Sequence, residues 1–420
     1  MKPLFARRPD PLPYQALIAL VFAGLVFAHL GIPSKLYFDE VHYVPAARAM
    51  LRGVSANPEH PLLAKEAIAL AIRVMGDQPL AWRLPSAVMG VVGLFAFGRA
   101  LWWSSGRAVA ALAGMVALGS DFAWFIQSRI AMLDMVMAGW AMVALWMVAR
   151  GRALPPEASA GARRGRMALA GVAMGLALGA KWSVLPVIAV VSGGMLGARL
   201  ARPRAAGLGL AELALWLVAV PGAVYWLTYW PAFFYARDAV APMDFVGWHR
   251  MMLGLQTSVV KHHPYQSVWW QWVINERAIW YLYERVDGAQ RGVMLIGNPF
   301  TMLAGLVALG WCAWDGWARG RALPLVLVAL YGGCLGLWIV GGKPVQFYYH
   351  YLLPGTVLMA ALGLAVDALW HTGRRWRREA WGIMALSLGV FAWFYPIIAA
   401  LPLHKGVASF EDWMWLDSWR

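Results

Sequence analysis

The sequence predicts an all-α polytopic membrane protein with about eleven transmembrane helices. Of its 420 residues, 61% are hydrophobic and only 14% are charged, whereas about a quarter of the residues of a soluble globular protein are charged. Several apolar runs reach or approach the roughly 20 residues that a helix needs to cross a bilayer. Basic residues gather in alternate connections between these runs, as expected for a chain that crosses the membrane repeatedly.

Eleven apolar runs are the expected spans. We place them at residues 14–31, 84–102, 108–126, 132–149, 167–180, 184–198, 208–228, 294–312, 323–340, 352–370 and 381–400. They divide the chain into an N-terminal membrane module (1–230), a second outer loop (231–293) and a C-terminal four-helix-type membrane module with an outer tail (294–420).

The net charge of +15 is concentrated on one side of this topology. The connections on the side of the N-terminus hold 19 of the 36 Lys and Arg residues but only six of the 21 Asp and Glu residues. The positive-inside rule therefore predicts that the N-terminus is inside and the C-terminus outside. This charge distribution makes anionic lipid headgroups the expected partner of the basic residues, and it does not support binding to nucleic acid.

Two large segments lie on the outer side, at residues 32–83 and 229–293. Both are rich in Trp, Tyr, His, Asp and Glu, which are expected on loops that carry function. In the first segment, apolar residues at helical spacing predict two amphipathic helices in the membrane interface, at 39–51 and 61–75. In the second, the aromatic-rich stretch 267–283 suits the headgroup region. We therefore expect the chemistry on the outer side, facing the periplasm of a bacterial inner membrane.

Two adjacent carboxylates, Asp39 and Glu40, follow the first span closely. A positioned carboxylate can take the proton of an attacking hydroxyl, which accelerates a reaction by about 10²–10⁴-fold. The same pair also suits the start of a helix, where an acidic N-cap and an acid in the first turn are favourable. Spacing alone does not separate these two interpretations.

Three ionisable residues are expected at the outer ends of central spans: Arg129, Asp134 and Lys181. Ionisable groups at membrane depth are costly and usually have a partner. The two cations suit a lipid phosphate, which Arg can bind with two hydrogen bonds and Lys as a point charge. In the alternative interpretation Arg129 pairs with Asp134, and Lys181 extends to the membrane surface.

Histidines occur in three outer stretches, at His60, His262-His263 and His350. His60 can bind a substrate or orient a carboxylate, or it can begin an interfacial helix with Pro61 at the first position. Adjacent histidines make a poor chelate and no Cys or carboxylate lies at ligand spacing, so no metal site is predicted. Walker, dinucleotide-binding and nucleophile-elbow motifs are absent from the sequence, which does not support a nucleotide-sugar donor.

Seven motifs, taken in chain order, resemble those of the protein O-mannosyltransferase family of the multi-span glycosyltransferase C superfamily. They are Phe38-Asp39-Glu40; His60-Pro61-Leu62-Leu63-Ala64-Lys65, with Leu62 where the family has a second Pro; Arg83-Leu84-Pro85; Ser128-Arg129 with Leu133-Asp134; Lys181-Trp182; His263-Pro264-Tyr265-Gln266-Ser267 with Trp269-Trp270 and Trp272; and Tyr348-Tyr349-His350-Tyr351-Leu352 with Pro354. Each motif is weak alone, but seven in order are specific. The family's eleven spans, with the N-terminus inside, match the topology derived above.

The resemblance implies a polyprenyl-phosphate-mannose donor, a protein Ser or Thr acceptor and inversion at the sugar carbon. It implies Asp39 as the base, Glu40 as a partner that shapes the site, and Arg129 and Lys181 on the donor phosphate. The further substrate-binding residues that it implies are His60, Lys65, Arg83, Asp134, His263, Tyr265, Tyr349 and His350. No cofactor is predicted, because the lipid phosphate is already a good leaving group and need not require a metal.

The chain departs from the larger eukaryotic members in one respect. Those members carry a soluble β-trefoil domain between spans seven and eight, and the corresponding loop here has only about 65 residues. The acceptor therefore stays open, and two alternatives remain. One is transfer of another lipid-linked sugar to lipid A or a glycan. The other is a transporter of lipids or solutes, which would place charged residues near the bilayer midplane on broken helices.

Overall fold

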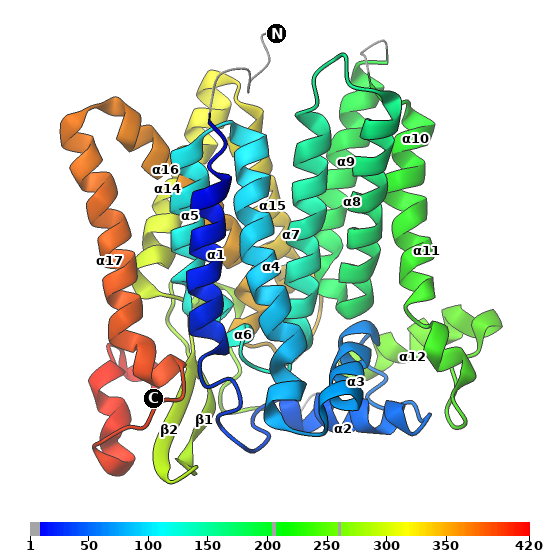
Figure 1. Cartoon of the computed structure of the whole chain (residues 1–420), viewed down its shortest axis with the longest axis vertical. Helices are drawn as coiled ribbons and strands as arrows, with labels where there is room; N and C mark the ends of the chain where they lie inside the picture. Colours follow the sequence, from blue (N-terminus) through cyan, green and yellow to red (C-terminus); the bar gives the residue numbers. More distant parts are fainter. Residues whose placement is uncertain (1–8, 204–206, 259–261) are drawn as a thin grey trace.

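The computed structural model describes residues 9–203, 207–258 and 262–420, which form a bundle of long helices (Figure 1). Each of the eleven expected spans coincides with helical structure. The helices are α1 Leu12–Phe27, α4 Pro79–Ser105, α5 Ala108–Gly119 with α6 Phe122–Gln127, α7 Leu133–Arg152, α8 Ala160–Ala180, α9 Leu185–Ala201, α10 Leu210–Ala214 with α11 Val220–Leu227, α14 Pro299–Arg319, α15 Ala322–Val340, α16 Leu352–Thr372 and α17 Arg374–Ile398. A π-helical turn, Leu215–Ala219, joins α10 to α11.

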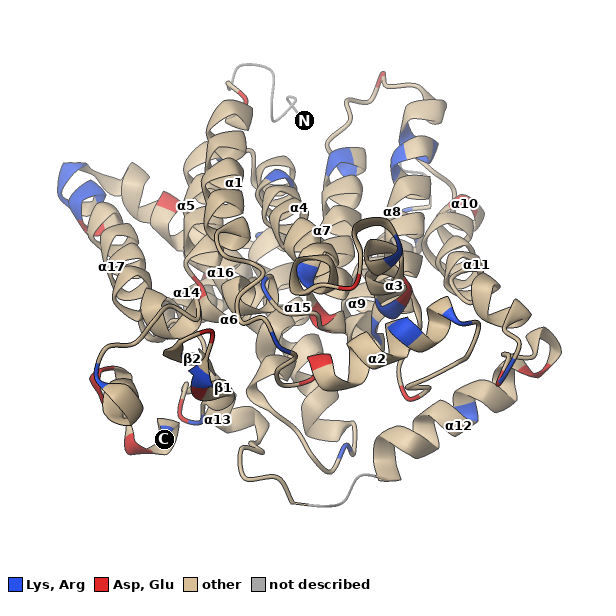
Figure 2. Cartoon of the chain, turned by 60° about the horizontal axis from the view of Figure 1, so that its bottom comes forward, with Lys and Arg blue, Asp and Glu red and all other residues tan. Residues whose placement is uncertain are grey.

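The chain is a multi-pass membrane protein. Within the described residues, seven helical segments are long and apolar enough to cross a bilayer, and α1 and α5 are shorter apolar helices. Charged residues gather at the helix ends and in the connections (Figure 2). The count of eleven, the direction of insertion and the module boundaries at 230 and 294 stay predictions. Four basic residues of the charge argument lie outside the described residues: Lys2, Arg7, Arg8 and Arg204.

Burial separates the central helices from the peripheral ones. In the most apolar stretches of α7 and α16, 72% and 78% of the residues are buried, against 22% in the segment that contains α9. Small residues allow the central helices to approach closely. A Cβ atom on Gly139 of α7 would lie 2.6 Å from the Met89 carbonyl oxygen of α4. This close approach lets α7 pack directly against α4 in the centre of the bundle.

The first outer segment forms the two helices that the sequence predicts. They are α2 Glu40–Leu51 and α3 Leu63–Met75. Both lie at the end of the bundle opposite the start of α1, and α2 runs across the direction of the long helices (Figure 1). The last residues of the chain lie at this same end.

The second outer segment contains a feature that an all-α prediction misses. After α12 Phe245–Ser258 and α13 Trp269–Val273, strands β1 Ile279–Val286 and β2 Ala289–Leu295 form an antiparallel hairpin. Its turn is Asp287-Gly288, with φ of +50° and +75°. Two such residues favour the tight turn whose twist matches that of paired strands. The prediction for 267–283 considered only aromatic content and overlooked this turn.

The remaining elements are short connections. They are η1 Trp182–Val184, η3 Trp230–Phe234, η4 Pro242–Asp244, η5 Tyr348–Tyr351, η6 Gly406–Trp413 and η7 Asp417–Trp419. Two of them, η1 and η5, directly precede long helices; Lys181 comes immediately before η1, and Tyr349 and His350 lie within η5.

Candidate active site

Asp39 is presented by a strained turn that the hairpin supports. The preceding residue, Phe38, has a φ of +49°, a left-handed conformation that is rare for a bulky side chain and costs on the order of 1–3 kcal/mol. The Phe38 ring stacks on Tyr281 of β1, with the ring centroids 3.8 Å apart. Tyr281 in turn accepts a hydrogen bond from the Gln127 amide, at 3.2 Å. The hairpin therefore stabilises the turn that places Asp39 at the start of α2.

The Asp39 carboxylate does not act as a helix cap. Asp39 does occupy the N-cap position of α2 and Glu40 is the acid of the first turn, as the helix-start interpretation expects, but the Asp39 side chain accepts no capping hydrogen bond. In residues 9–203, 207–258 and 262–420, nothing donates to or ion-pairs with this partly buried carboxylate. Burial raises the pKa of Asp39 from 3.8 to about 6, although the positive charge of Lys181 opposes this rise. A carboxylate with these properties is suited to accept a proton near neutral pH.

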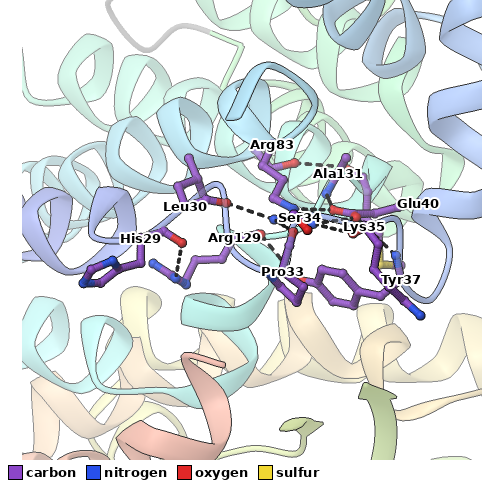
Figure 3. Close-up of polar contacts among 12 residues, drawn as sticks. His29, Leu30, Pro33, Ser34, Lys35, Tyr37, Glu40, Arg83, Arg129 and Ala131 are labelled. Carbon is purple, nitrogen blue, oxygen red and sulfur yellow. Dashed lines mark hydrogen bonds and ion pairs between the residues drawn. The ribbon is translucent and has the colours of Figure 1, made fainter. Parts of the chain in front are cut away.

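The adjacent Glu40 is, by contrast, fully engaged. It is buried and accepts hydrogen bonds from Arg83 at 2.8 and 3.0 Å and from the Ala131 N–H at 3.0 Å (Figure 3). Arg83 also donates to main-chain carbonyl oxygens within residues 30–35. The pair therefore ties the turn after α1 to α4 and to the turn before α7. Arg83, which we expected to bind substrate, is 0% exposed and is committed to this link.

Arg129 lies in the same buried cluster (Figure 3). One nitrogen of its guanidinium donates to the carbonyl oxygens of Leu25, Val26 and Ala28, at 3.0, 2.6 and 2.8 Å. These carbonyls belong to the last turn of α1, where helix geometry leaves them without an internal partner. Arg129 is 6% exposed. The alternative pairing of Arg129 with Asp134 is wrong, because Asp134 has another partner.

That partner is Lys181. Its ammonium lies 2.8 Å from both carboxylate oxygens of Asp134, and both side chains are buried. The alternative that Lys181 extends to the membrane surface is therefore also wrong. The ammonium also lies 5.0 Å from the centre of the Tyr349 ring. The charges of Lys181 and Asp134 both act on Asp39, so the structure brings these predicted residues together.

His60 faces this group from the turn before α3. Burial and the charges of Lys181 and Lys343 hold the pKa of His60 well below its usual value, so its ring is neutral near pH 7. Its ring lies 6.3 Å from that of Tyr43 on α2. Lys65 is 0% exposed and donates to the His60 carbonyl oxygen at 3.0 Å and also to that of Asn57. Lys65 thus positions the turn that carries His60.

The C-terminal half adds His350, which lies within η5 just before α16. Its Nδ1 accepts the Phe347 N–H at 3.0 Å, and its ring stacks on Trp338 with centroids 3.8 Å apart. Because Nδ1 accepts a hydrogen bond, the ring carries its proton on Nε2, and this buried nitrogen has no hydrogen-bond partner among the described residues. His350, Trp338, Tyr349 and Asp134 line one narrow pocket.

His263 and Tyr265 support this region from the second outer segment. The His263 ring meets Phe347 edge-on at 5.1 Å, and the Tyr265 N–H donates to His263 Nδ1 at 3.2 Å. This pair therefore contacts Phe347, whose N–H donates to His350, and does not contact the Asp39 carboxylate.

Two residues near Asp39 were absent from the predicted site. Tyr281 could have been found from the Asp-Gly hairpin signal, which places it on a strand facing the outer turn. Lys343 begins the polar and aromatic cluster that continues through 346–351, just before the span at 352–370, but none of the family motifs includes it. In the described part of the chain, no group of three or more His, Cys, Asp or Glu side chains is arranged to hold a metal.

Comparison with protein families identifies two regions of this chain. Residues 80–235 match the model described as dolichyl-phosphate-mannose-protein mannosyltransferase. Residues 242–323 match the model of the C-terminal four-transmembrane region of protein O-mannosyltransferase. The two regions together cover more than half of the chain.

Curated relatives extend this similarity over nearly the whole length. The chain is 29% identical to the polyprenol-phosphate-mannose–protein mannosyltransferase of Mycolicibacterium smegmatis, over 96% of this chain and 92% of that protein. It is 28% identical to the protein of the same name from Corynebacterium glutamicum, with the same coverage.

Solved structures share the fold. The S. cerevisiae protein O-mannosyltransferase Pmt1-Pmt2 complex bound to the sugar donor superposes with a TM-score of 0.84 at 14% identity, over 99% of this chain and 93% of that chain. ArnT from Cupriavidus metallidurans bound to undecaprenyl phosphate gives a TM-score of 0.60 at 18% identity, over 90% of this chain and 63% of that chain. The family models, the curated relatives and the fold agree with the motifs of the sequence, and the chain belongs to the protein O-mannosyltransferase family.

Proposed function

We propose that this protein transfers mannose from a polyprenyl-phosphate-mannose donor to Ser or Thr hydroxyls of a protein acceptor, with inversion. The observation that carries the proposal is the Asp39 carboxylate, which has a raised pKa, no partner among the described residues, and the Lys181–Asp134 pair beside it. The curated relatives are named for this reaction.

The proposed reaction requires one proton transfer and one displacement. The acceptor hydroxyl gives its proton to Asp39 while its oxygen forms a bond to the anomeric carbon of mannose. The bond from that carbon to the phosphate oxygen breaks, and the electron pair leaves with the lipid phosphate. With a pKa of about 6, the Asp39 carboxyl group is mostly deprotonated at pH 7, and it is more basic than an ordinary carboxylate. It can therefore accept the proton of the acceptor hydroxyl.

The outer face of the bacterial inner membrane is the proposed location. The elements that build the site, α2, α3 and the hairpin, lie at one end of the bundle (Figure 1). The positive-inside rule makes this the outer end. A polyprenyl donor in the outer leaflet would present its phosphate at the depth of the Lys181–Asp134 pair, since both residues lie at the ends of spanning helices.

A second donor sugar is the main rival, because the ArnT fold is also similar to this one. In this alternative the same site transfers an aminoarabinose-type sugar to lipid A or a glycan. The transporter alternative loses its support, because the chain belongs to a glycosyltransferase family.

A direct test uses the purified full-length chain with polyprenyl-phosphate-mannose and a Ser/Thr-rich peptide, with transfer followed by mass spectrometry of the peptide. We expect a gain of one hexose per modified hydroxyl, and we expect Asp39→Asn to abolish it. Parallel reactions with polyprenyl-phosphate-aminoarabinose and lipid A test the rival. Transfer with that pair alone, or full transfer by Asp39→Asn, would contradict the proposal.

A further inference from the structure

The cations near Asp39 differ in whether they already have hydrogen-bond or ion-pair partners in the protein. Arg129 donates to three carbonyl oxygens at the end of α1. Lys181 lies 2.8 Å from both oxygens of Asp134, so the pair is close to neutral. Lys343 is different, because the structure, over the residues it describes, gives its ammonium no ion pair and no hydrogen bond.

The main chain around Lys343 is held in place. It lies in the connection between α15 and η5, directly after Gly342, which has a φ of +64°. The Gln346 amide donates to the carbonyl oxygens of Trp338 and Lys343, at 3.0 and 3.1 Å, and closes the turn. The Gln346 carbonyl accepts the Ser267 N–H at 2.9 Å. The backbone is therefore fixed, while the half-buried side chain is left without a partner.

Lys343 interacts electrostatically with charged groups of the proposed active site. The charges that act on it are those of Lys181, Asp134, Asp39 and Glu59. Asp39 is the carboxylate that takes up a proton in the proposed reaction. When it does so, it loses the negative charge that balances Lys343, at the moment when the departing phosphate gains one. The site thus becomes more favourable for an anion as the reaction proceeds.

A second donor is connected to the Lys343 turn through Trp338, whose carbonyl oxygen shares the Gln346 amide with that of Lys343 and whose ring stacks on His350. The Nε2–H of His350 is buried and has no hydrogen-bond acceptor in the described residues. Stacking on Trp338 and the bond from the Phe347 N–H fix its direction. The charges of Lys343 and Lys181 both act on this ring. A buried N–H without an acceptor is costly, and a phosphate oxygen would satisfy it.

We propose that Lys343 is the cation that binds the phosphate of the lipid-linked donor and of the polyprenyl-phosphate product, with His350 Nε2–H as a second hydrogen-bond donor. The ammonium keeps its proton and pairs with the phosphate charge, before and after the bond between sugar and phosphate breaks. This inference rests on the proposed function for the identity of the lipid, and it replaces Arg129 as the main phosphate ligand.

The test measures binding separately from transfer. The purified full-length chain is titrated with farnesyl phosphate and with farnesol, and intrinsic Trp fluorescence follows binding. We expect Lys343→Gln to weaken the affinity for farnesyl phosphate by about tenfold or more while leaving that for farnesol unchanged, because charge-assisted hydrogen bonds are lost. Lys343→Arg should restore most of the affinity. The matched control is Lys405→Gln, which removes an exposed outer lysine paired with Asp412.

A second measurement uses the unmodified protein. Its lysines are chemically acetylated in the presence and in the absence of farnesyl phosphate, and the acetylated positions are mapped by mass spectrometry. We expect farnesyl phosphate to protect Lys343, but not Lys405, from acetylation. Unchanged farnesyl phosphate affinity in Lys343→Gln, an equal loss for farnesol, or no protection of Lys343 would overturn the inference. Failure of mannose transfer with this phosphate selectivity intact would instead overturn the proposed reaction alone.

Discussion

Asp39 and Glu40 are adjacent carboxylates, yet their amide variants should change stability in opposite directions. The Asp39 carboxylate has no partner in the described residues, and burial raises its pKa from 3.8 to about 6. One pKa unit corresponds to about 1.4 kcal/mol, so the ionised form costs up to about 3 kcal/mol of folding free energy at pH 7. Asp39→Asn removes that charge with little change of shape. We expect a higher free energy of unfolding and no transfer activity.

Glu40→Gln should have the opposite effect on stability. Glu40 is the ion-pair partner of Arg83, and both side chains are 0% exposed. Removing one charge of a buried pair leaves the other uncompensated, which costs about 3–5 kcal/mol. The two variants differ by one position and make the same chemical change, so each is the matched control of the other.

The assay is thermal unfolding of the purified full-length chain, followed by Trp fluorescence at several pH values. At pH 7 we expect the highest apparent Tm for Asp39→Asn, an intermediate value for the unmodified chain and the lowest value for Glu40→Gln. The raised pKa means that the folded state binds the Asp39 proton more tightly than the unfolded state does. This contribution to stability is fully present below pH 3.8 and is lost as the pH rises through about 6. The advantage of Asp39→Asn should therefore shrink as the pH falls from 7 to 4. A loss of Tm in Asp39→Asn comparable to that in Glu40→Gln would refute the reasoning, because it would mean that Asp39 has a structural partner.

Three further predictions test other parts of the site and the fold. The kcat/KM for transfer should fall about tenfold per pH unit below pH 6 as Asp39 becomes protonated, which initial rates at peptide concentrations well below KM would measure. Lys65→Met should lower kcat/KM by about tenfold, since it frees the turn that carries His60; an unchanged rate would argue against that positioning role. Gly139→Ala should lower the free energy of unfolding by about 1–3 kcal/mol, because the added Cβ overpacks the contact with α4. The control is Gly193→Ala on α9, where nothing lies within 4 Å of the added Cβ, and it should leave the apparent Tm unchanged or slightly higher.

Much of the architecture can be predicted from composition and order alone. Apolar runs mark the helices because a bilayer or a buried core selects for the same residues, and each of the eleven runs coincides with helical structure. The two short outer helices follow from apolar residues at helical spacing, and α2 and α3 begin within two residues of the expected positions. The hairpin at 279–295 needed the Asp-Gly turn signal, which the surrounding aromatic residues obscured.

The sequence by itself determined the membrane class of this protein, its family motifs and most of the residues from which the site is built, with Tyr281 and Lys343 as the exceptions. Only the tertiary structure decided how their charges are used. It assigns Arg129 to the carbonyls of α1, Lys181 to Asp134 and Glu40 to Arg83, and it leaves Asp39 and Lys343 without partners in the part of the chain that it describes. The reason is physical: these partners lie between 43 and 104 positions apart. No local pattern records which of several possible partners the packing of helices brings within hydrogen-bond distance.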